Sequence, residues 1–385
     1  MLSSILMESA GTAGLSTVLG KPLGYDEDSA NRIAMESAIE LGDIFYESFF
    51  QMEELDFQYS YATMEGASDA VLEGIGASIK ERASGALASI RDFLGKLWKK
   101  IQEFFFNVKR FLLGVFKNAQ DFVTKYEKEL NALTFSKKGY KVEIYEYSYD
   151  KLSDVADTIY KKATAGAESG DKLADNLVSV IRKKAASFTK DLDDTHSIKD
   201  ADGPALTDDV MKQIDEYGKK VITEIDNYVI GQIHGIKPDF DNSALNNAIW
   251  SACRAGAKDD RDKKTINISS LNEYVSFLKT STNMIKQLDN SKKNAANMFK
   301  TAENAIKSAE STVSKVEGDD KAAKTTAEVA VKVCRGLSKA ISRASNISNA
   351  LNSGIKSAAT EKVKVYKKIC TSAFSHADKA EKEEK

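Results

Sequence analysis

Cysteine, proline and histidine are scarce in this chain of 385 residues, which contains three of each. Cys253, Cys334 and Cys370 lie far apart and form no CxxC pair, so neither a disulfide framework nor a cysteine metal site is expected. The three histidines show no metal-ligand spacing either. Because proline interrupts helices, its scarcity favours long ones. We therefore expect a helical protein without disulfides, metals or cofactors.

Sequence motifs of catalysis and of membrane insertion are also missing. The chain has no GxSxG nucleophile motif, no phosphate-binding GxxxxGK[ST] and no dinucleotide-binding GxGxxG. The acidic segment DLDDTHSIKDADGP (191–204) lacks the glycine and the distal glutamate of a calcium loop, so we expect a solvated polar loop. No stretch approaches the roughly 20 apolar residues that cross a bilayer, and the first residues lack the basic start of a secretory signal. The sequence predicts a protein that is not an enzyme, is made in the cytoplasm and is not inserted in a membrane.

The net charge of −2 hides a strong asymmetry along the chain. Residues 1–80 carry fourteen acidic and three basic side chains, a net charge of −11, whereas the remainder carries +9. We assign residues 1–75 as an acidic leader that is a candidate propeptide. A basic body favours a polyanionic partner such as DNA, bound without sequence specificity. The alternative is that leader and body are both simply solvated by water and that the body has no such partner.

The strongest helical pattern runs over residues 87–133. Apolar residues recur every three or four positions and form a broad stripe that includes Trp98 and several phenylalanines. The pattern predicts one long helix, or two in series bent at Gly114. The stripe is either the core of a helical domain, which we favour, or a face for a membrane interface. The opposite face supplies the candidate contacts to phosphates or to a membrane, which are Lys96, Lys99, Lys100, Lys109, Arg110 and Lys117.

A small β element is expected near residues 139–149. Tyr140, Val142 and Ile144 alternate with charged residues, and the alternation changes phase after Ile144, which would require a bulge or a change of buried face. Because one strand is not stable alone, it needs a partner, either the apolar TINIS at 265–269 or another chain. Further helices are predicted at 151–190 and 206–232.

The C-terminal third is expected to form an antiparallel helical hairpin. Thin, alanine-rich stripes run over about 271–317 and 322–352, and the charged EGDDK at 317–321 lies between them. Residues 271–385 carry a net charge of +8. The fold class is thus mainly α, with long amphipathic helices, the small β element and this hairpin. Beyond the leader, the predicted domains are a helical core at 76–265, the hairpin at 266–355 and a charged tail at 356–385.

The leader repeats a short phrase, MESA at 7–10, MESA at 35–38 and MEGA at 64–67. Of the nine glutamates in residues 1–75, five are followed at once by serine or glycine, namely Glu8, Glu36, Glu47, Glu65 and Glu73. Three of the five also have an isoleucine three positions before the glutamate. This frequency exceeds the roughly two such pairs that ordinary residue usage would produce.

These glutamates resemble the sites cut by the prohead proteases of tailed bacteriophages. Those enzymes cleave after glutamate, before a small residue, with isoleucine, leucine or a small residue two or three positions upstream. Glu36, preceded by Ile33 and Ala34, fits this pattern best, followed by Glu8 and Glu47, and then by Glu65 and Glu73. Alternatively, the phrase recurs by coincidence in weakly helical sequence and has no link to cleavage, because glutamate and small residues are common near helix starts.

The order of an acidic leader and a basic body resembles the internal head proteins of large tailed phages. These proteins often carry an acidic helical propeptide, removed during head maturation, ahead of a basic body that stays with DNA. The resemblance covers directly only the N-terminal fifth of the chain. It implies a virion structural protein of the capsid interior, with the prohead protease, other virion proteins and nonspecific DNA as partners.

Two other interpretations remain open from the sequence. In the first, the chain is a membrane-active or pore-forming helical protein that inserts residues 87–133, and a membrane is then its partner. In the second, it is a coiled-coil scaffold or interaction protein that self-associates through the hairpin.

Overall fold

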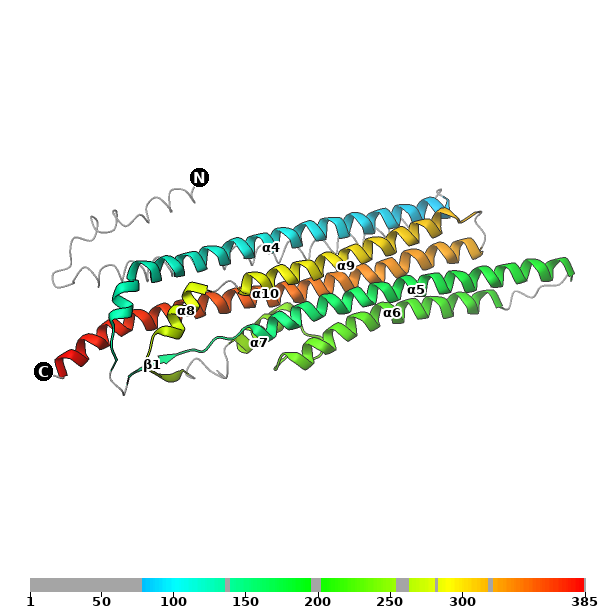
Figure 1. The fold of residues 1–385 in the computed structure, drawn as a ribbon. Coiled ribbons are helices and arrows are strands. Elements are labelled where there is room, and N and C mark those ends of the chain that lie inside the picture. Colours follow the sequence, from blue (N-terminus) through cyan, green and yellow to red (C-terminus); the bar gives the residue numbers. More distant parts are fainter. Residues whose placement is uncertain are drawn as a thin grey trace, which may run out of the picture. The chain divides into compact units, whose positions relative to one another are not determined.

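The computed structural model describes residues 78–135, 139–194, 202–253, 263–280, 283–317 and 321–383. The acidic leader and its five candidate cleavage residues lie outside these ranges. Residues 66–385 form one compact unit, in which long helices run beside one another (Figure 1). The described part contains seven helices, α4 to α10, and two short strands, so the prediction of a mainly α fold with a small β element is confirmed.

The long amphipathic helix is a single element, α4, at Ile79–Ala132. A capping box starts it, because Ser78 Oγ accepts a hydrogen bond from Glu81 N at 3.3 Å and Glu81 Oε2 accepts one from Ser78 N at 2.9 Å. The helix continues through Gly114 without interruption. Its apolar stripe is buried from Ala83 to Leu130, so this side belongs to the core.

The predicted strand finds its partner within the chain. β1, Tyr140–Ile144, pairs antiparallel with β2, Lys264–Ile268, and Tyr140 stands opposite Ile268. Gly139 turns the chain into β1 with φ +60°, and a Cβ there would lie 2.5 Å from the carbonyl oxygen of Ile268. No bulge is needed for the change of phase after Ile144, because β1 ends at that residue.

Two long helices follow β1, α5 at Asp150–Asp194 and α6 at Asp202–Gln232, and both confirm the sequence expectation. They are longer than predicted, because the first four and the last three residues of the expected loop at 191–204 are helical. Glycines let the helices approach closely. A Cβ on Gly166 of α5 would lie only 2.6 Å from Val221 Cγ1 of α6, and one on Gly218 of α6 would lie 3.4 Å from the Cα of Gly336.

The C-terminal hairpin consists of α9, Asn283–Ser314, and α10, Lys321–Glu383, which run in opposite directions side by side (Figure 1). α8, Asn272–Thr280, precedes them, and α7, Asn242–Cys253, lies before β2. α10 contacts each of the other six described helices and is therefore the central helix of this unit. Many of its buried residues are alanines and serines, and Gly336 and Gly354 lie at close contacts with other helices, which permits this close packing on several sides.

The predicted division of residues 76–385 differs from the structure at both internal boundaries. The boundary between 265 and 266 falls inside β2, and the boundary between 355 and 356 falls inside α10. The expected charged tail continues as helix, and its Val363, Ile369 and Cys370 are buried. Tyr140 Oη also donates a hydrogen bond to the carbonyl oxygen of Ile369 at 2.9 Å, which ties β1 to this part of α10. The segment 356–376 thus contributes several side chains to the core.

Candidate functional site

Four of the six candidate cations on α4 form one exposed row. Lys96, Lys99, Arg110 and Lys117 are all exposed. At 100° per residue they fall within about 60° of one another around the helix axis, and they span about 32 Å along it. Buried side chains such as Ile101 occupy the opposite side. We call these four residues the α4 row.

The other two candidate cations stand apart from this row. Lys109 forms an ion pair with Asp289 of α9, with Lys109 Nζ 2.8 Å from Asp289 Oδ2. Arg91 and Glu310 form a second ion pair between the same two helices. Lys100 is half-buried at the other edge of the face. The exposed positions of the α4 row agree with the basic face expected from the sequence, whereas the ion-pair partner of Lys109, Asp289, lies 180 residues further along the chain.

The apolar side of α4, which a membrane-inserting role would use, is covered in the structure by α9 and α10. For example, the rings of Trp98 and Phe299 of α9 have centroids 5.1 Å apart. Two large apolar side chains of α4 remain exposed beside the α4 row, Phe106 at 61% and Leu113 at 51%. No helix in the described ranges has an apolar stretch long enough to cross a membrane.

Cations of α10 contribute less to the surface than their number suggests, because several hold the core together. Arg343 Nε donates to Asp226 Oδ1 of α6 at 2.8 Å, and its guanidinium lies 4.3 Å from the centre of the Phe240 ring. Lys367 is 5% exposed, and its Nζ donates to Asn118 Oδ1 of α4 at 2.5 Å. Burial lowers the pKa of Lys367 to about 8. Some basic side chains of the hairpin, such as Arg343 and Lys367, therefore join α10 to other helices.

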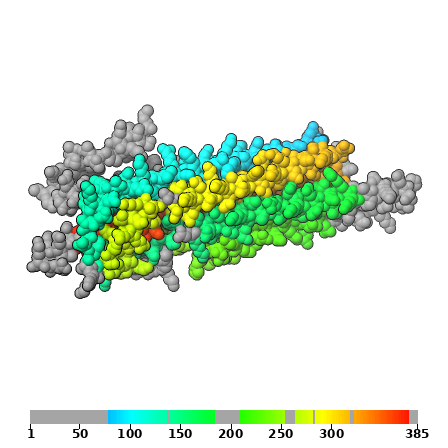
Figure 2. All heavy atoms as spheres, in the orientation of Figure 1, coloured from blue at the N-terminus to red at the C-terminus, as the bar shows by residue number. Residues whose placement is uncertain are grey.

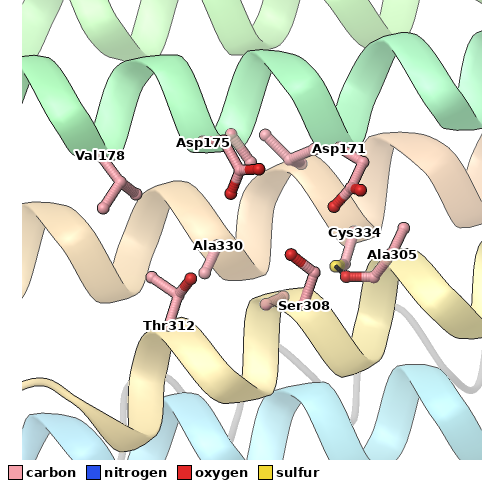
Figure 3. Close-up of a pocket in the computed structure, with 11 residues that line it drawn as sticks. Asp171, Asp175, Val178, Ala305, Ser308, Thr312, Ala330 and Cys334 are labelled. Atoms are coloured by element: carbon pink, nitrogen blue, oxygen red, sulfur yellow. Dashed lines mark hydrogen bonds between the residues drawn. The ribbon is translucent and has the colours of Figure 1, made fainter.

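A small hollow lies where α5, α9 and α10 meet (Figure 3). Asp171 of α5 reaches toward Ser308 of α9 and Cys334 of α10, and the space suits about one water molecule. Burial raises the pKa of the Asp171 carboxyl, and the hydrogen bond with Ser308 opposes that shift. Burial also raises the pKa of Cys334 to about 12, so its thiol is protonated and unreactive at neutral pH.

No sequence motif predicts this hollow, because its lining residues come from three segments that only the fold brings together. Among the described residues, no group of three or more His, Cys, Asp or Glu side chains could hold a metal ion. The hollow therefore does not have the residues of a metal centre or an activated nucleophile, and the exposed cations of α4 remain the better candidate site.

Comparison of the chain with protein-family models, with curated proteins and with solved structures found no match.

Proposed function

We propose that this chain is a structural protein of a tailed-phage virion, packaged inside the capsid. Its acidic leader is cut after glutamate by the prohead protease, with Glu36 as the first candidate. Its basic helical body is not enzymatic and associates with packaged DNA or with the inner capsid surface, beside other virion proteins. The charge difference between leader and body and the five pairs of glutamate with a small residue support the proposal.

The observation that carries the DNA part of the proposal is the α4 row. Cations that project from one side of a packed helix keep a fixed spacing, because the opposite side is held in the core. Such cations neutralise phosphates and release counterions without reading base edges. A packaged protein that meets DNA of every sequence requires this kind of contact.

Neutralising the α4 row is expected to weaken DNA binding and its dependence on salt. In the full chain, Lys96, Lys99, Arg110 and Lys117 are replaced together by glutamine. Each lost phosphate contact reduces the slope of log K against log salt by about 0.9, so we expect the slope to fall by about 2 to 4. Fluorescence anisotropy with two unrelated 24-base-pair duplexes, between about 25 and 200 mM salt, measures both the affinity and the slope.

The matched control carries the same change in charge on other helices, with Lys172, Lys212, Lys219 and Lys220 replaced by glutamine. These four lysines are exposed on α5 and α6. The control is expected to keep the affinity of the unaltered chain within about threefold. Equal losses in both variants, or no binding by the unaltered chain at low salt, would contradict the proposed role of the α4 row.

A further inference from the structure

A second row of cations runs along the outside of α9. Its lysines recur every seven residues, and asparagines fall between them at the same interval. All seven side chains are exposed, and they are Lys286, Asn290, Lys293, Asn297, Lys300, Asn304 and Lys307. Because the spacings alternate between four and three, the seven residues share one face of the helix. We call this face the α9 row.

The opposite face of α9 is buried with the same period of seven residues. Leu288, Ala295, Ala302 and Ala309 all lie in the core. The α9 row therefore points away from the core and is held in that orientation by packing along most of the helix. Its four lysines span about 32 Å at 1.5 Å per residue.

Three acidic residues lie beside the α9 row. Asp289, Glu303 and Glu310 each follow one of its lysines by three positions, and each has a cationic partner. Asp289 pairs with Lys109 and Glu310 with Arg91, both on α4. Glu303 pairs with Lys307 one turn further along α9, with Glu303 Oε1 2.7 Å from Lys307 Nζ. Because these carboxylates pair with Lys109, Arg91 and Lys307, the other three lysines of the row, Lys286, Lys293 and Lys300, remain exposed to an external anion.

The two rows lie on neighbouring helices. α4 and α9 run antiparallel, because Lys80 bonds to Ser314, Arg91 to Glu310 and Lys109 to Asp289 in that order. Figure 2 shows the two helices side by side along one face of this unit. Since each row lies opposite the buried side of its own helix, both rows project from the same side of the helix pair.

We propose that the α9 row, together with the α4 row, binds the sugar–phosphate backbone of double-stranded DNA. This inference rests on the proposed function and names the surface and the form of nucleic acid that it takes. Lysines seven residues apart are about 10.5 Å apart along the helix, which is close to three base-pair rises of about 3.4 Å along the axis of a DNA duplex. The asparagine amides between them donate hydrogen bonds to phosphate and sugar oxygens.

The composition of the α9 row favours a duplex over other polyanions. The row has no aromatic side chain on which an unpaired base could stack, as single-stranded binding requires. It also has no large apolar side chain to enter a bilayer, whereas Phe106 and Leu113 are exposed beside the α4 row. A row of lysines and asparagines can contact the regularly spaced phosphates on the outside of a duplex.

The test uses the full chain with Lys286, Lys293 and Lys300 replaced together by glutamine. These three are exposed, so circular dichroism is expected to show an unchanged fold. The variant should bind the 24-base-pair duplexes at least tenfold more weakly at about 50 mM salt, with a slope of log K against log salt smaller by about 2 to 3. The matched control, with Lys212, Lys219 and Lys220 replaced by glutamine, should stay within about threefold of the unaltered chain.

Three outcomes would overturn the inference. If the unaltered chain binds DNA and the α4-row variant weakens binding while the α9-row variant does not, the α9 row is not a contact and the proposed function stands. If the unaltered chain does not bind DNA, the inference fails together with the DNA part of the proposed function. If the α9 lysines govern binding to phosphatidylglycerol vesicles more strongly than binding to the duplex, the surface takes a lipid instead.

Discussion

A chain that ends at residue 355 is expected to lose its cooperative fold. The removed segment contributes Val363, Ile369 and Cys370 to the core, together with several buried alanines. Burying one valine or isoleucine contributes about 1.5 to 3 kcal/mol, and a whole domain is stable by only about 5 to 15 kcal/mol. The deletion also removes the acceptor of the Tyr140 hydroxyl and the ammonium group that covers Phe122. Thermal unfolding followed by circular dichroism measures the effect.

The control for this truncation ends at residue 377 and keeps every buried side chain named above. It is expected to unfold cooperatively, within a few degrees of the full chain. If the chain ending at 355 unfolded as cooperatively and at nearly the same temperature, residues 356–376 would be a dispensable tail, as their charge suggests. Their packing against α4 and β1 would then contribute little to the stability of the unit.

Replacing Gly354 by valine is expected to lower the free energy of unfolding by about 1 to 3 kcal/mol. Gly354 lies on α10 where α7 crosses it, and a Cβ there would overlap Cγ2 of Ile249. It would also lie 3.8 Å from Cys253 Sγ, which donates to the Gly354 carbonyl oxygen. Because Ile249 and Cys253 are buried, they have little room to move, and α7 must shift away from α10.

The matched control is valine at Gly114, where nothing lies within 4 Å of an added Cβ. Both positions are helical glycines, so the change in helix propensity is the same and only the packing differs. Chemical denaturation of both variants should show a loss at Gly354 and a neutral or slightly stabilising change at Gly114. Equal stabilities would mean that α7 does not pack against α10 at this position.

The elements that the sequence predicted best are those with a strong local pattern. The period of the apolar stripe over 87–133 predicted α4, and the alternation of β-branched and aromatic residues predicted β1. The TINIS segment was one of two partners that the sequence left open for β1, and the structure pairs the two. In α4 and β1 the buried and exposed residues alternate at the period of the element itself, so no distant contact is needed to recognise it.

From the sequence, the last helix of the hairpin was predicted to end too early, because the many lysines after residue 355 are typical of an exposed tail. Residues 356–368 contain five lysines, a composition typical of a solvated tail. In the structure, Lys356 and Lys367 are nevertheless buried, since their long stems pack on apolar surface and their ammonium groups lie over the rings of Phe111 and Phe122. Both aromatic rings belong to α4, more than 200 residues away in the chain. Sequence spacing does not predict this contact.

The candidate site could be predicted only in part for a similar reason. The exposure of Lys96, Lys99, Arg110 and Lys117 follows from their place opposite the apolar stripe, but the ion pair of Lys109 depends on which helix lies beside α4. The α9 row had a readable signal, the seven-residue repeat of lysine and asparagine. It becomes informative once Leu288 and the alanines of the same period are known to be buried on the other side.

Mass spectrometry of purified particles of the tailed phage that we propose as the source of this chain tests the central claim most directly. The account predicts that the chain is present in mature virions and that its first residue directly follows one of the five candidate glutamates, with Ser37 after Glu36 as the first expectation. Peptides upstream of that residue should be found in uncleaved heads and be absent from mature ones. Intact peptides covering residues 1–74 in mature particles, or particles without this chain, would contradict the account.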